Sequence, residues 1–320
     1  MIYHFNEAMR PSGLFVFLAI FVSAFAEPSP ECIVTSFSQV MDITMNCIDI
    51  IVRNLTVPAG NTVHFHLKDG ASVTFEGTTT FEYFQWPEWG NYLMQFHGNN
   101  VNVEGAPDGV TITDWNIDCS YGDGRGGHNT DGFDVISARN VVIKDSTVVN
   151  QDDCVAVNQG FNMHFSGLYC NGSHGISLSV GFSKTSHFDN TVRNVTYSNC
   201  TVVNSINAIH IKTHNDGGPG VISDVTYENI RFSDIINFGI SIQEDYADGG
   251  STGIVKGNVP IVNLIFRDIK GTLSETSTNS TAVYIFCADN GCLDWTWSDI
   301  SIPAGVIRSW CNFQPKGYTC

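Results

Sequence analysis

The chain has 320 residues, of which 42% are hydrophobic and 15% are charged, and its net charge at pH 7 is −17. This composition excludes a disordered chain, and the length is enough for one large core or two ordinary ones. The charge argues against nucleic acid as a partner, because binding phosphates requires clustered basic residues and only 15 Lys and Arg are present. We expect one elongated, acidic domain.

The first 26 residues have the features of a secretory signal peptide. Arg10 precedes an apolar run from Leu14 to Val22, and Ala24-Phe25-Ala26 supplies small residues at a cleavage site. The run is shorter than the about 20 apolar residues needed to cross a bilayer. We therefore predict that residues 1–26 are removed, that residues 27–320 form a single domain, and that the product is secreted to the extracellular space without a membrane partner.

Ten cysteines, an even number, are typical of an oxidising compartment. Short separations favour the pairs Cys32 with Cys47, Cys154 with Cys170, Cys287 with Cys292, and Cys311 with Cys320. Cys119 and Cys200 remain, and they either pair with each other or include a buried thiol. Five acceptor sequences for N-glycosylation begin at Asn54, Asn171, Asn194, Asn199 and Asn279.

A strand-forming pattern is already present from Asn54 to Phe84. It includes Val63-His64-Phe65-His66-Leu67, in which His64 and His66 lie on one strand face. Two such histidines can bind a metal ion, but no third ligand is near them in the sequence. We expect a solvated strand face there, and we predict neither a metal nor a cofactor.

From about residue 100 onward, short alternating strands and polar turns recur with a period of roughly 20 to 35 residues. The repeated segments begin near Asn140, Asn162, Asn194, Asp224 and Val262. Later strands such as 208–212 and 239–243 show the same alternation, and no helical periodicity persists for more than a few turns. Because similar strands recur in the same order at coil-length spacing, without hairpin turns between neighbours, we predict an all-β chain forming a right-handed parallel β-helix.

The acidic residues lie in the polar turns. Asp131 and Asp152 are 21 residues apart, and so are Asp153 and His174. In a solenoid, equal offsets place residues above one another, about one strand spacing apart. An Asp-Asp pair alone is more often a solvated turn, but this spacing predicts three carboxylates and a histidine on one face. His210 and Lys212 project from one face of a later strand.

These motifs resemble a known family. Asn129-Thr130-Asp131, Asp152-Asp153, Ser173-His174-Gly175 and Ile209-His210-Ile211-Lys212, in this order, are similar to the signature motifs of the polygalacturonases of glycoside hydrolase family 28. The resemblance extends from about Cys32 to Cys320. Residues 243–249 resemble the family segment that carries an active-site tyrosine, and residues 287–292 resemble its small disulfide loop.

The resemblance implies inverting hydrolysis of α-1,4 bonds in polygalacturonate. Asp152 would be the general acid, Asp131 and Asp153 would hold and deprotonate the attacking water, and His174 would tune the protonation of this cluster. The substrate-binding residues implied are Asn129, His210, Lys212 and Tyr246, with Lys212 binding a galacturonate carboxylate. The implied partners are pectin and plant polygalacturonase-inhibiting proteins, and the implied state is a monomer.

The chain departs from the family pattern in three places. His210 stands where an arginine is usual, and with an ordinary pKa of about 6.5 it would lose its charge, and weaken substrate binding, as pH rises through that range. Ser173 replaces a glycine. One to two coils are missing between residues 109–115 and Asp118-Cys119. These departures leave room for a non-catalytic relative that binds pectin fragments or inhibitor proteins, and a polysaccharide lyase on the same fold is a further alternative.

Overall fold

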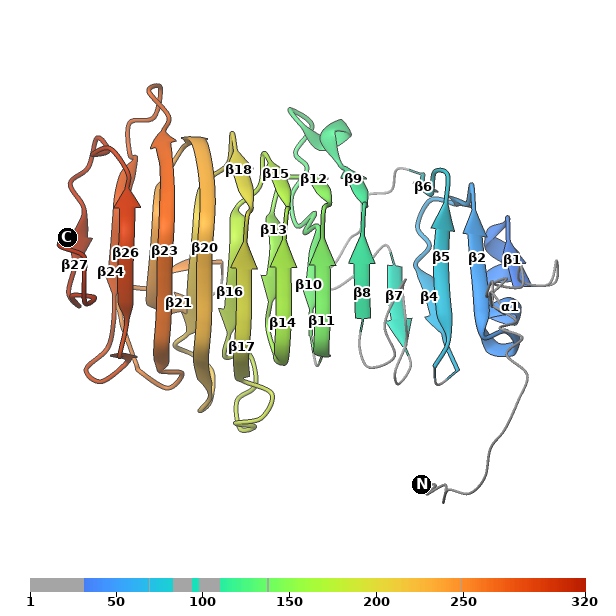
Figure 1. Cartoon of the computed structure of the whole chain (residues 1–320), viewed down its shortest axis with the longest axis horizontal. Coiled ribbons are helices and arrows are strands. Elements are labelled where there is room, and N and C mark those ends of the chain that lie inside the picture. The colour runs from blue at the N-terminus through green and yellow to red at the C-terminus, as the bar shows by residue number, and fades with distance from the viewer. Residues whose placement is uncertain (1–31, 69, 83–93, 98–109, 137, 248) are drawn as a thin grey trace, which may run out of the picture.

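The computed structural model describes residues 32–68, 70–82, 94–97, 110–136, 138–247 and 249–320, so the predicted signal peptide lies outside the described residues. The described chain is a right-handed parallel β-helix whose coils stack in one row from the N-terminal to the C-terminal end (Figure 1). Its helices are η2 (Phe37–Gln39), α1 (Val40–Asn46) and η3 (Ser120–Gly122). None of the described helices is long and apolar enough to cross a membrane.

Two large sheets hold most of the strands. One contains, in spatial order, β10 (Phe133–Val135), β13 (Asp153–Val157), β16 (Gly175–Val180), β19 (Asn207–His214), β21 (Phe238–Ala247), β24 (Thr281–Phe286) and β27 (Trp310–Cys311), with β22 (Gly250–Ser251) beside β21. The other contains, in spatial order, β8 (Val110–Thr113), β11 (Ala138–Lys144), β14 (Gly160–Ser166), β17 (Thr191–Ser198), β20 (Val221–Ile235), β18 (Thr201–Val203), β15 (Tyr169–Asn171), β12 (Thr147–Val149) and β9 (Asn116–Asp118). In the same sheet β23 (Ile261–Leu273) pairs with β20, and β25 (Cys292–Leu293) and β26 (Thr296–Ser301) pair with β23. Every pairing in them is parallel except that of β21 with β22.

The predicted coil starts are confirmed by the strand register. Val141 pairs with Met163, Met163 with Val195, Val195 with Val225, and Val225 with Leu264. Each of these positions is buried, because apolar residues at alternate strand positions all point into the solenoid. The stack of equivalent side chains therefore forms one continuous core.

Asparagines within several strands turn the chain locally by adopting the left-handed conformation, which a non-glycine residue adopts most easily when its short amide side chain bonds locally. Asn140, Asn162 and Asn194 have φ between 54° and 59°. Their side chains form a ladder in which Asn194 Nδ2 donates to Asn162 Oδ1 (2.9 Å) and Asn162 Nδ2 donates to Asn140 Oδ1 (3.1 Å). Each turn is thus tied to the turn of the next coil.

The four predicted disulfides are all present, linking Cys32 to Cys47, Cys154 to Cys170, Cys287 to Cys292, and Cys311 to Cys320. Cys119 and Cys200 are both free, and Cys200 is the buried one. The alternative in which they pair with each other is therefore wrong.

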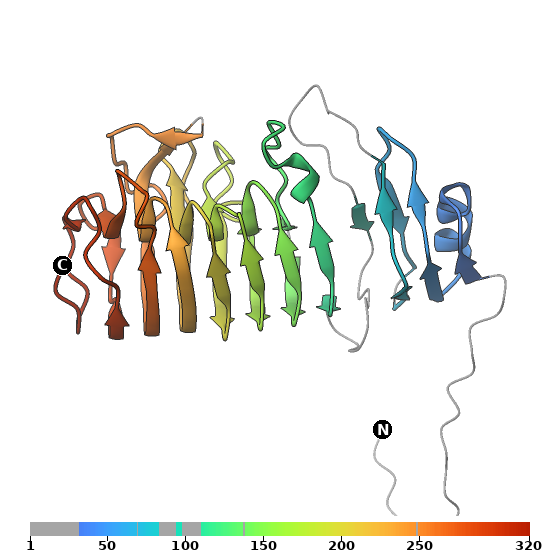
Figure 2. The same cartoon turned by 90° about the horizontal axis from the view of Figure 1, so that it is seen from above.

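Three small N-terminal sheets precede the large ones (Figures 1 and 2). In the first, β2 (Asp49–Arg53) lies between β1 (Ile33–Val34) and β5 (Ser72–Glu76). The other two pair β3 (Thr56–Val57) with β6 (Thr80–Phe81), and β4 (Val63–His66) with β7 (Met94–His97). Within the described ranges, no backbone pairing joins these sheets to β8 or β10. The core continues across this boundary through Trp115, whose ring lies 5.0 Å from Phe75 and 6.2 Å from Phe133.

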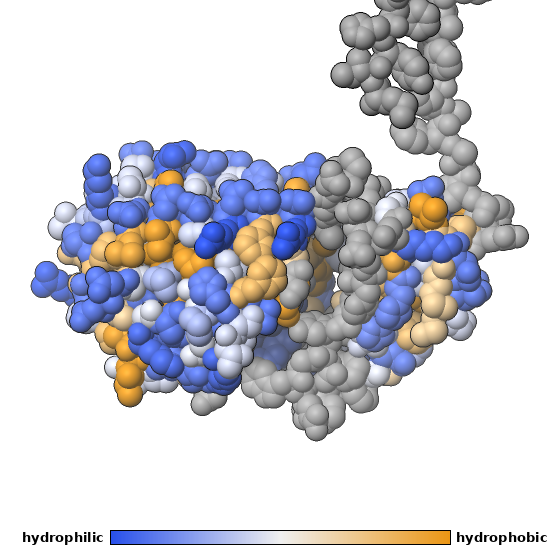
Figure 3. Space-filling view, turned by 90° about the horizontal axis from the view of Figure 1, so that it is seen from below, coloured by the Kyte–Doolittle hydropathy of each residue, from blue (hydrophilic) through white to orange (hydrophobic). Residues whose placement is uncertain are grey.

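The surface matches the acidic, polar composition. His64 and His66 lie on the exposed face of β4, as predicted, with ring centroids 6.0 Å apart. The side of the molecule seen in Figure 3 is mostly hydrophilic and carries separate hydrophobic patches.

Candidate active site

The acidic turns lie at the entry to successive strands of the sheet that contains β10, β13, β16 and β19. The predicted offset of 21 residues is one short at the first of these turns, because Phe133 pairs with Val155, an offset of 22. Asp153 pairs with Gly175, also an offset of 22, but a β-bulge follows and Val155 pairs with Ile176, an offset of 21. A constant spacing in the sequence could not reveal this bulge. The stacking prediction is otherwise confirmed.

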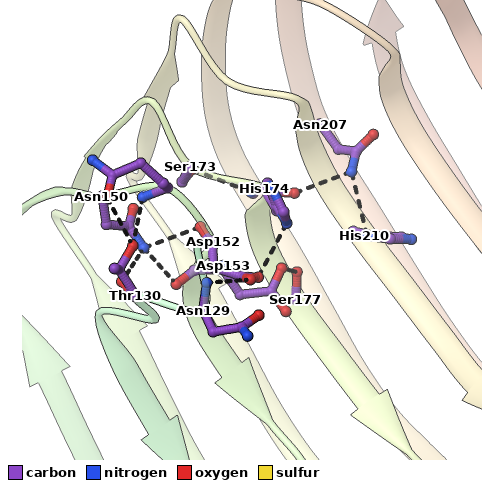
Figure 4. Close-up of polar contacts among 12 residues, drawn as sticks. Asn129, Thr130, Asn150, Asp152, Asp153, Ser173, His174, Ser177, Asn207 and His210 are labelled. Atoms are coloured by element: carbon purple, nitrogen blue, oxygen red, sulfur yellow. Dashed lines mark hydrogen bonds and ion pairs between the residues drawn. The ribbon is translucent and has the colours of Figure 1, made fainter. Parts of the chain in front are cut away.

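Asp152 and His174 form the exposed part of the site (Figure 4). His174 Nδ1 lies 3.0 Å from Asp152 Oδ1, and the backbone N–H groups of Asn129 (3.2 Å) and Asp153 (2.8 Å) donate to the same carboxylate. Burial raises the pKa of Asp152, but the hydrogen bond and charge of His174 and the Asp153 N–H outweigh it, so the pKa is below its usual value. The hydrogen bond to Asp152 raises the pKa of His174 despite burial. The pair therefore favours imidazolium next to carboxylate.

Asp131 lies in the turn before β10. Burial raises its pKa to about 8, and the nearby charges of Asp152, Asp134 and Asp153 act in the same direction against a smaller lowering by Lys212. The carboxyl that stays protonated at neutral pH is thus Asp131. Asp152, which the resemblance implies to be the general acid, has a lowered pKa instead.

Asp153 and Lys212 form a buried ion pair. Lys212 Nζ lies 2.9 Å from Asp153 Oδ2, and the exposed fractions of the two side chains are 8% and 3%. Ser177 Oγ donates to the other carboxylate oxygen at 2.7 Å. Burial lowers the pKa of Lys212, but the Asp153 carboxylate outweighs this effect and the pKa is raised. The ammonium predicted to bind a substrate carboxylate therefore already neutralises Asp153.

Ligand atoms of Asp152, Asp153 and His174 lie within 4.8 Å of one another, a spacing that could hold a metal ion. A cation there would compete with the Lys212 ammonium for Asp153 and with the imidazole proton for Asp152. These three side chains are therefore better suited to holding and transferring protons than to binding a divalent ion.

His210 lies on β19 between Ser177 and Ser241 of the flanking strands. Its Nδ1 is 3.3 Å from Asn207 Nδ2. Burial first, and then the charge of Lys212, hold the pKa of His210 well below its usual value. The expectation that His210 loses a charge in mildly acidic solution is therefore wrong, because the ring is already neutral there.

Tyr246, on β21, lies over the same group of side chains. Its ring centroid is 5.2 Å from Lys212 Nζ, 5.3 Å from the His214 ring and 6.2 Å from the His210 ring. The His214 ring in turn packs 4.0 Å from Phe182. The structure thus brings the predicted Tyr246, His210 and Lys212 together. Asn129 is exposed and contacts the cluster through its backbone, at a φ of 50°.

Several residues that hold the site were missed in the sequence. Buried Asn150 uses Nδ2 to bond the carbonyls of Thr130 (2.8 Å), Asp152 (3.0 Å) and Asp153 (2.9 Å), which fixes the first acidic turn against the second. Its position directly before Gln151-Asp152-Asp153 was a signal that could have been used. Ser177 could also have been found, because it alternates with the buried Ile176 on its strand.

Ser173, the residue in place of the usual glycine, is accommodated. Its hydroxyl is buried 3.0 Å from Ser205 Oγ and accepts the Gly175 N–H at 3.1 Å. The substitution therefore adds bonds that hold the turn carrying His174.

Comparison with known proteins points in one direction. A family model described as "Glycosyl hydrolases family 28" matches residues 99–320. A polygalacturonase from Phaedon cochleariae is 38% identical over 350 residues, and the match covers 91% of this chain and 93% of the relative. A probable endopolygalacturonase A from Neosartorya fischeri is 36% identical over 355 residues, and that match covers 93% of this chain and 94% of the relative. Both aligned stretches are longer than the 320-residue chain, so these relatives contain residues that it lacks.

Two solved structures have the same fold. Endopolygalacturonase I from Stereum purpureum, complexed with two galacturonates, has a TM-score of 0.63 and 26% identity, with coverage of 87% of this chain and 96% of that one. An endo-xylogalacturonan hydrolase from Aspergillus tubingensis also has a TM-score of 0.63, at 19% identity and with coverage of 90% and 98%. The second likeness concerns the fold alone.

Proposed function

This chain belongs to glycosyl hydrolases family 28, and from that premise we propose that it is a polygalacturonase that hydrolyses α-1,4 bonds between galacturonate units of pectin. The observation that supports this most is the cluster in which Asp152 is bonded to His174 while Asp153 is neutralised by Lys212. The cluster provides both bound protons and ionised carboxylates within one small region. Hydrolysis of a glycosidic bond needs both.

The proposed reaction is a single displacement with inversion. One carboxyl protonates the leaving oxygen while another accepts a proton from water on the opposite face of the sugar, and about 6.5–9.5 Å separates the two. Asp153 suits the base, because Lys212 Nζ and Ser177 Oγ each bond one oxygen of its carboxylate and hold it in place. Asp131, protonated at neutral pH, can donate a hydrogen bond to the water.

Asp152 remains our proposed general acid, although it is ionised when the site is empty. The proton that it delivers would come from His174 along their 3.0 Å hydrogen bond, so no side chain has to move. Binding of an anionic sugar adds negative charge beside the pair, which favours protonation of the cluster. The leaving oxygen would then take the proton from Asp152.

A second candidate function is a relative that binds pectin fragments or inhibitor proteins without cleaving them. Two observations favour this alternative. His210, which stands where an arginine is usual, is neutral, and the chain lacks residues that the matched polygalacturonases contain. Four disulfides and the predicted signal peptide support secretion to the extracellular space for either function. Occupancy of the five glycosylation sequences stays a prediction, as does the monomeric state.

The test is release of reducing ends from polygalacturonate. A hydrolase releases them without a new ultraviolet-absorbing double bond and without loss in a chelator, whereas a lyase creates the absorbance. Asp152→Asn should lower turnover by roughly 10² or more. Asp234→Asn, at an exposed carboxylate on β20 of the other large sheet, is the matched control and should leave turnover unchanged. No release by the parent chain would favour the binding function.

A further inference from the structure

The outward face of the sheet that carries the candidate site continues beyond it toward the C-terminal end. Ser177 pairs with His210, His210 with Ser241, Ser241 with Tyr284, and Tyr284 with Trp310, on the consecutive strands β16, β19, β21, β24 and β27 (Figure 1). Because neighbouring strands lie about 4.8 Å apart, Tyr284 is about 10 Å and Trp310 about 14 Å from His210 along this row. The row therefore continues in register from the proposed reaction centre.

After Ser241 the residues of the row are aromatic. Tyr284 and Phe286 alternate with the fully buried Val283 and Ile285, so both aromatic rings lie on the outer face. The Tyr284 ring is 5.5 Å from Trp310 in a stacked arrangement, and Phe286 meets the Trp310 ring edge-on at 5.3 Å. We call Tyr284, Phe286 and Trp310 the aromatic end of the face.

Trp310 is the exposed member of this group. It is on β27, the last strand of its sheet, and 46% of it is accessible to solvent. Tyr284 and Phe286 contact its ring from two directions at different angles, which restricts its orientation. A rigid indole with one open side can stack on the apolar face of a sugar ring, where C–H groups gather.

The charges beside the aromatic end differ from those at the candidate site. Lys212 lies among the site residues, whereas the aromatic end is next to Asp245, because Gln243 pairs with Phe286 and its Nε2 donates to Asp245 Oδ1 at 3.3 Å. Asp245 is buried and also accepts hydrogen bonds from Ser251 Oγ and the Gly253 N–H. A free galacturonate carboxylate placed there would meet a like charge. A methyl-esterified unit would not.

We propose that Trp310, held by Tyr284 and Phe286, is a sugar-binding position for a pectin unit about three sugar units along the polysaccharide from the unit at His210, and that it selects a methyl-esterified unit over a free galacturonate. This proposal rests on the proposed function, which supplies the polysaccharide substrate. It adds the pattern of methyl esterification that the protein prefers in that substrate. The protein would thus take partly esterified pectin, with a free acid near Lys212 and an ester at the aromatic end.

Calorimetric binding of oligogalacturonates tests this, because it needs no turnover. The full chain carrying Asp152→Asn is titrated with a free-acid trimer, a free-acid hexamer and a partly methyl-esterified hexamer. The esterified hexamer should bind most tightly. Adding Trp310→Ala should weaken its binding by about 3-fold to 10-fold while leaving the trimer unchanged, since a trimer at the reaction centre does not reach Trp310.

Two control variants sharpen the result. Leu293→Ala removes an exposed apolar residue, 40% accessible, from a strand of the other large sheet and should change nothing. Arg308→Ala removes the exposed cation two residues before Trp310. If this loss weakens the free-acid hexamer most, Arg308 holds a carboxylate there and the preference for an ester is overturned.

Unchanged hexamer binding in Trp310→Ala would overturn the sugar-binding position itself. The aromatic end could instead bind a second copy of the chain. Sedimentation would then show a dimer that Trp310→Ala dissociates, and this result would also overturn the proposal. Failure of the proposed function is a separate result. Length-dependent binding without release of reducing ends by the parent chain would reject hydrolysis and support the aromatic end.

Discussion

Replacing Lys212 with methionine tests how much the buried ion pair stabilises the fold. The variant keeps the length of the side chain but leaves the Asp153 carboxylate, with 3% of its side chain exposed, without its cation. Removing one partner of a buried pair typically costs about 3–5 kcal/mol, because the remaining charge stays desolvated. Ser177 Oγ still donates to that carboxylate at 2.7 Å, so we expect a loss near the lower end of this range.

The assay is urea denaturation at neutral pH, with the free energy of unfolding extrapolated to water. Lys184→Met is the matched control, because Lys184 pairs with Asp216 at 2.6 Å but the side chains are 64% and 50% exposed. It should cost less than about 1 kcal/mol. The double variant Lys212→Met with Asp153→Asn should recover most of the stability, since no uncompensated charge remains. Equal losses in the two single lysine variants would refute the reasoning.

Three further predictions concern the cluster, His210 and the disulfides. Because the pKa of Asp131 is about 8 in the folded state and near 4 in the unfolded state, the free energy of unfolding should fall as pH rises between these values. The stabilisation from His174 is also lost as pH rises through its raised folded-state pKa. Urea denaturation at several pH values measures this dependence, and Asp131→Asn should flatten it. His210→Arg should tighten oligogalacturonate binding roughly ten-fold or more in calorimetry, since the parent ring is neutral, and equal affinities would show that this position does not touch the carboxylate. Replacing Cys154 and Cys170 by alanine, which opens a loop with a separation of 16 residues, should cost about 3 kcal/mol in thermal or urea unfolding, whereas Cys119→Ala should be nearly neutral.

The fold could be predicted because the solenoid repeats its own pattern. Asn162 and Asn194 occupy equivalent positions in neighbouring strands, and the apolar alternation that follows each of them can be recognised without long-range information. The four disulfides could be predicted as directly, from the short separations between their cysteines. The bulge after Asp153 could not be predicted, because one extra residue within a strand leaves the composition of the repeat unchanged.

Charge states were the harder part of the site. Lys212 was predicted to lie in the cleft, but its contact with Asp153, 59 residues earlier, depends on how three strands stack. The neutral state of His210 and the protonated state of Asp131 both result mainly from burial. Burial of a polar turn is a property of the assembled coils, so residue types alone could not assign it.

The separation of Asp153 from Lys212 also orders events during synthesis. Their strands, β13 and β19, are not neighbours, because β16 lies between them. The ion pair can therefore close only after a whole intervening coil has docked, and loop-closure entropy makes such distant contacts form late. A nascent chain that has not yet emerged to β19 would hold its acidic turns without their cation, and the mutual repulsion of these carboxylates would keep the turns open. Docking of β19 is thus the step that supplies the acidic turns with their cation, Lys212.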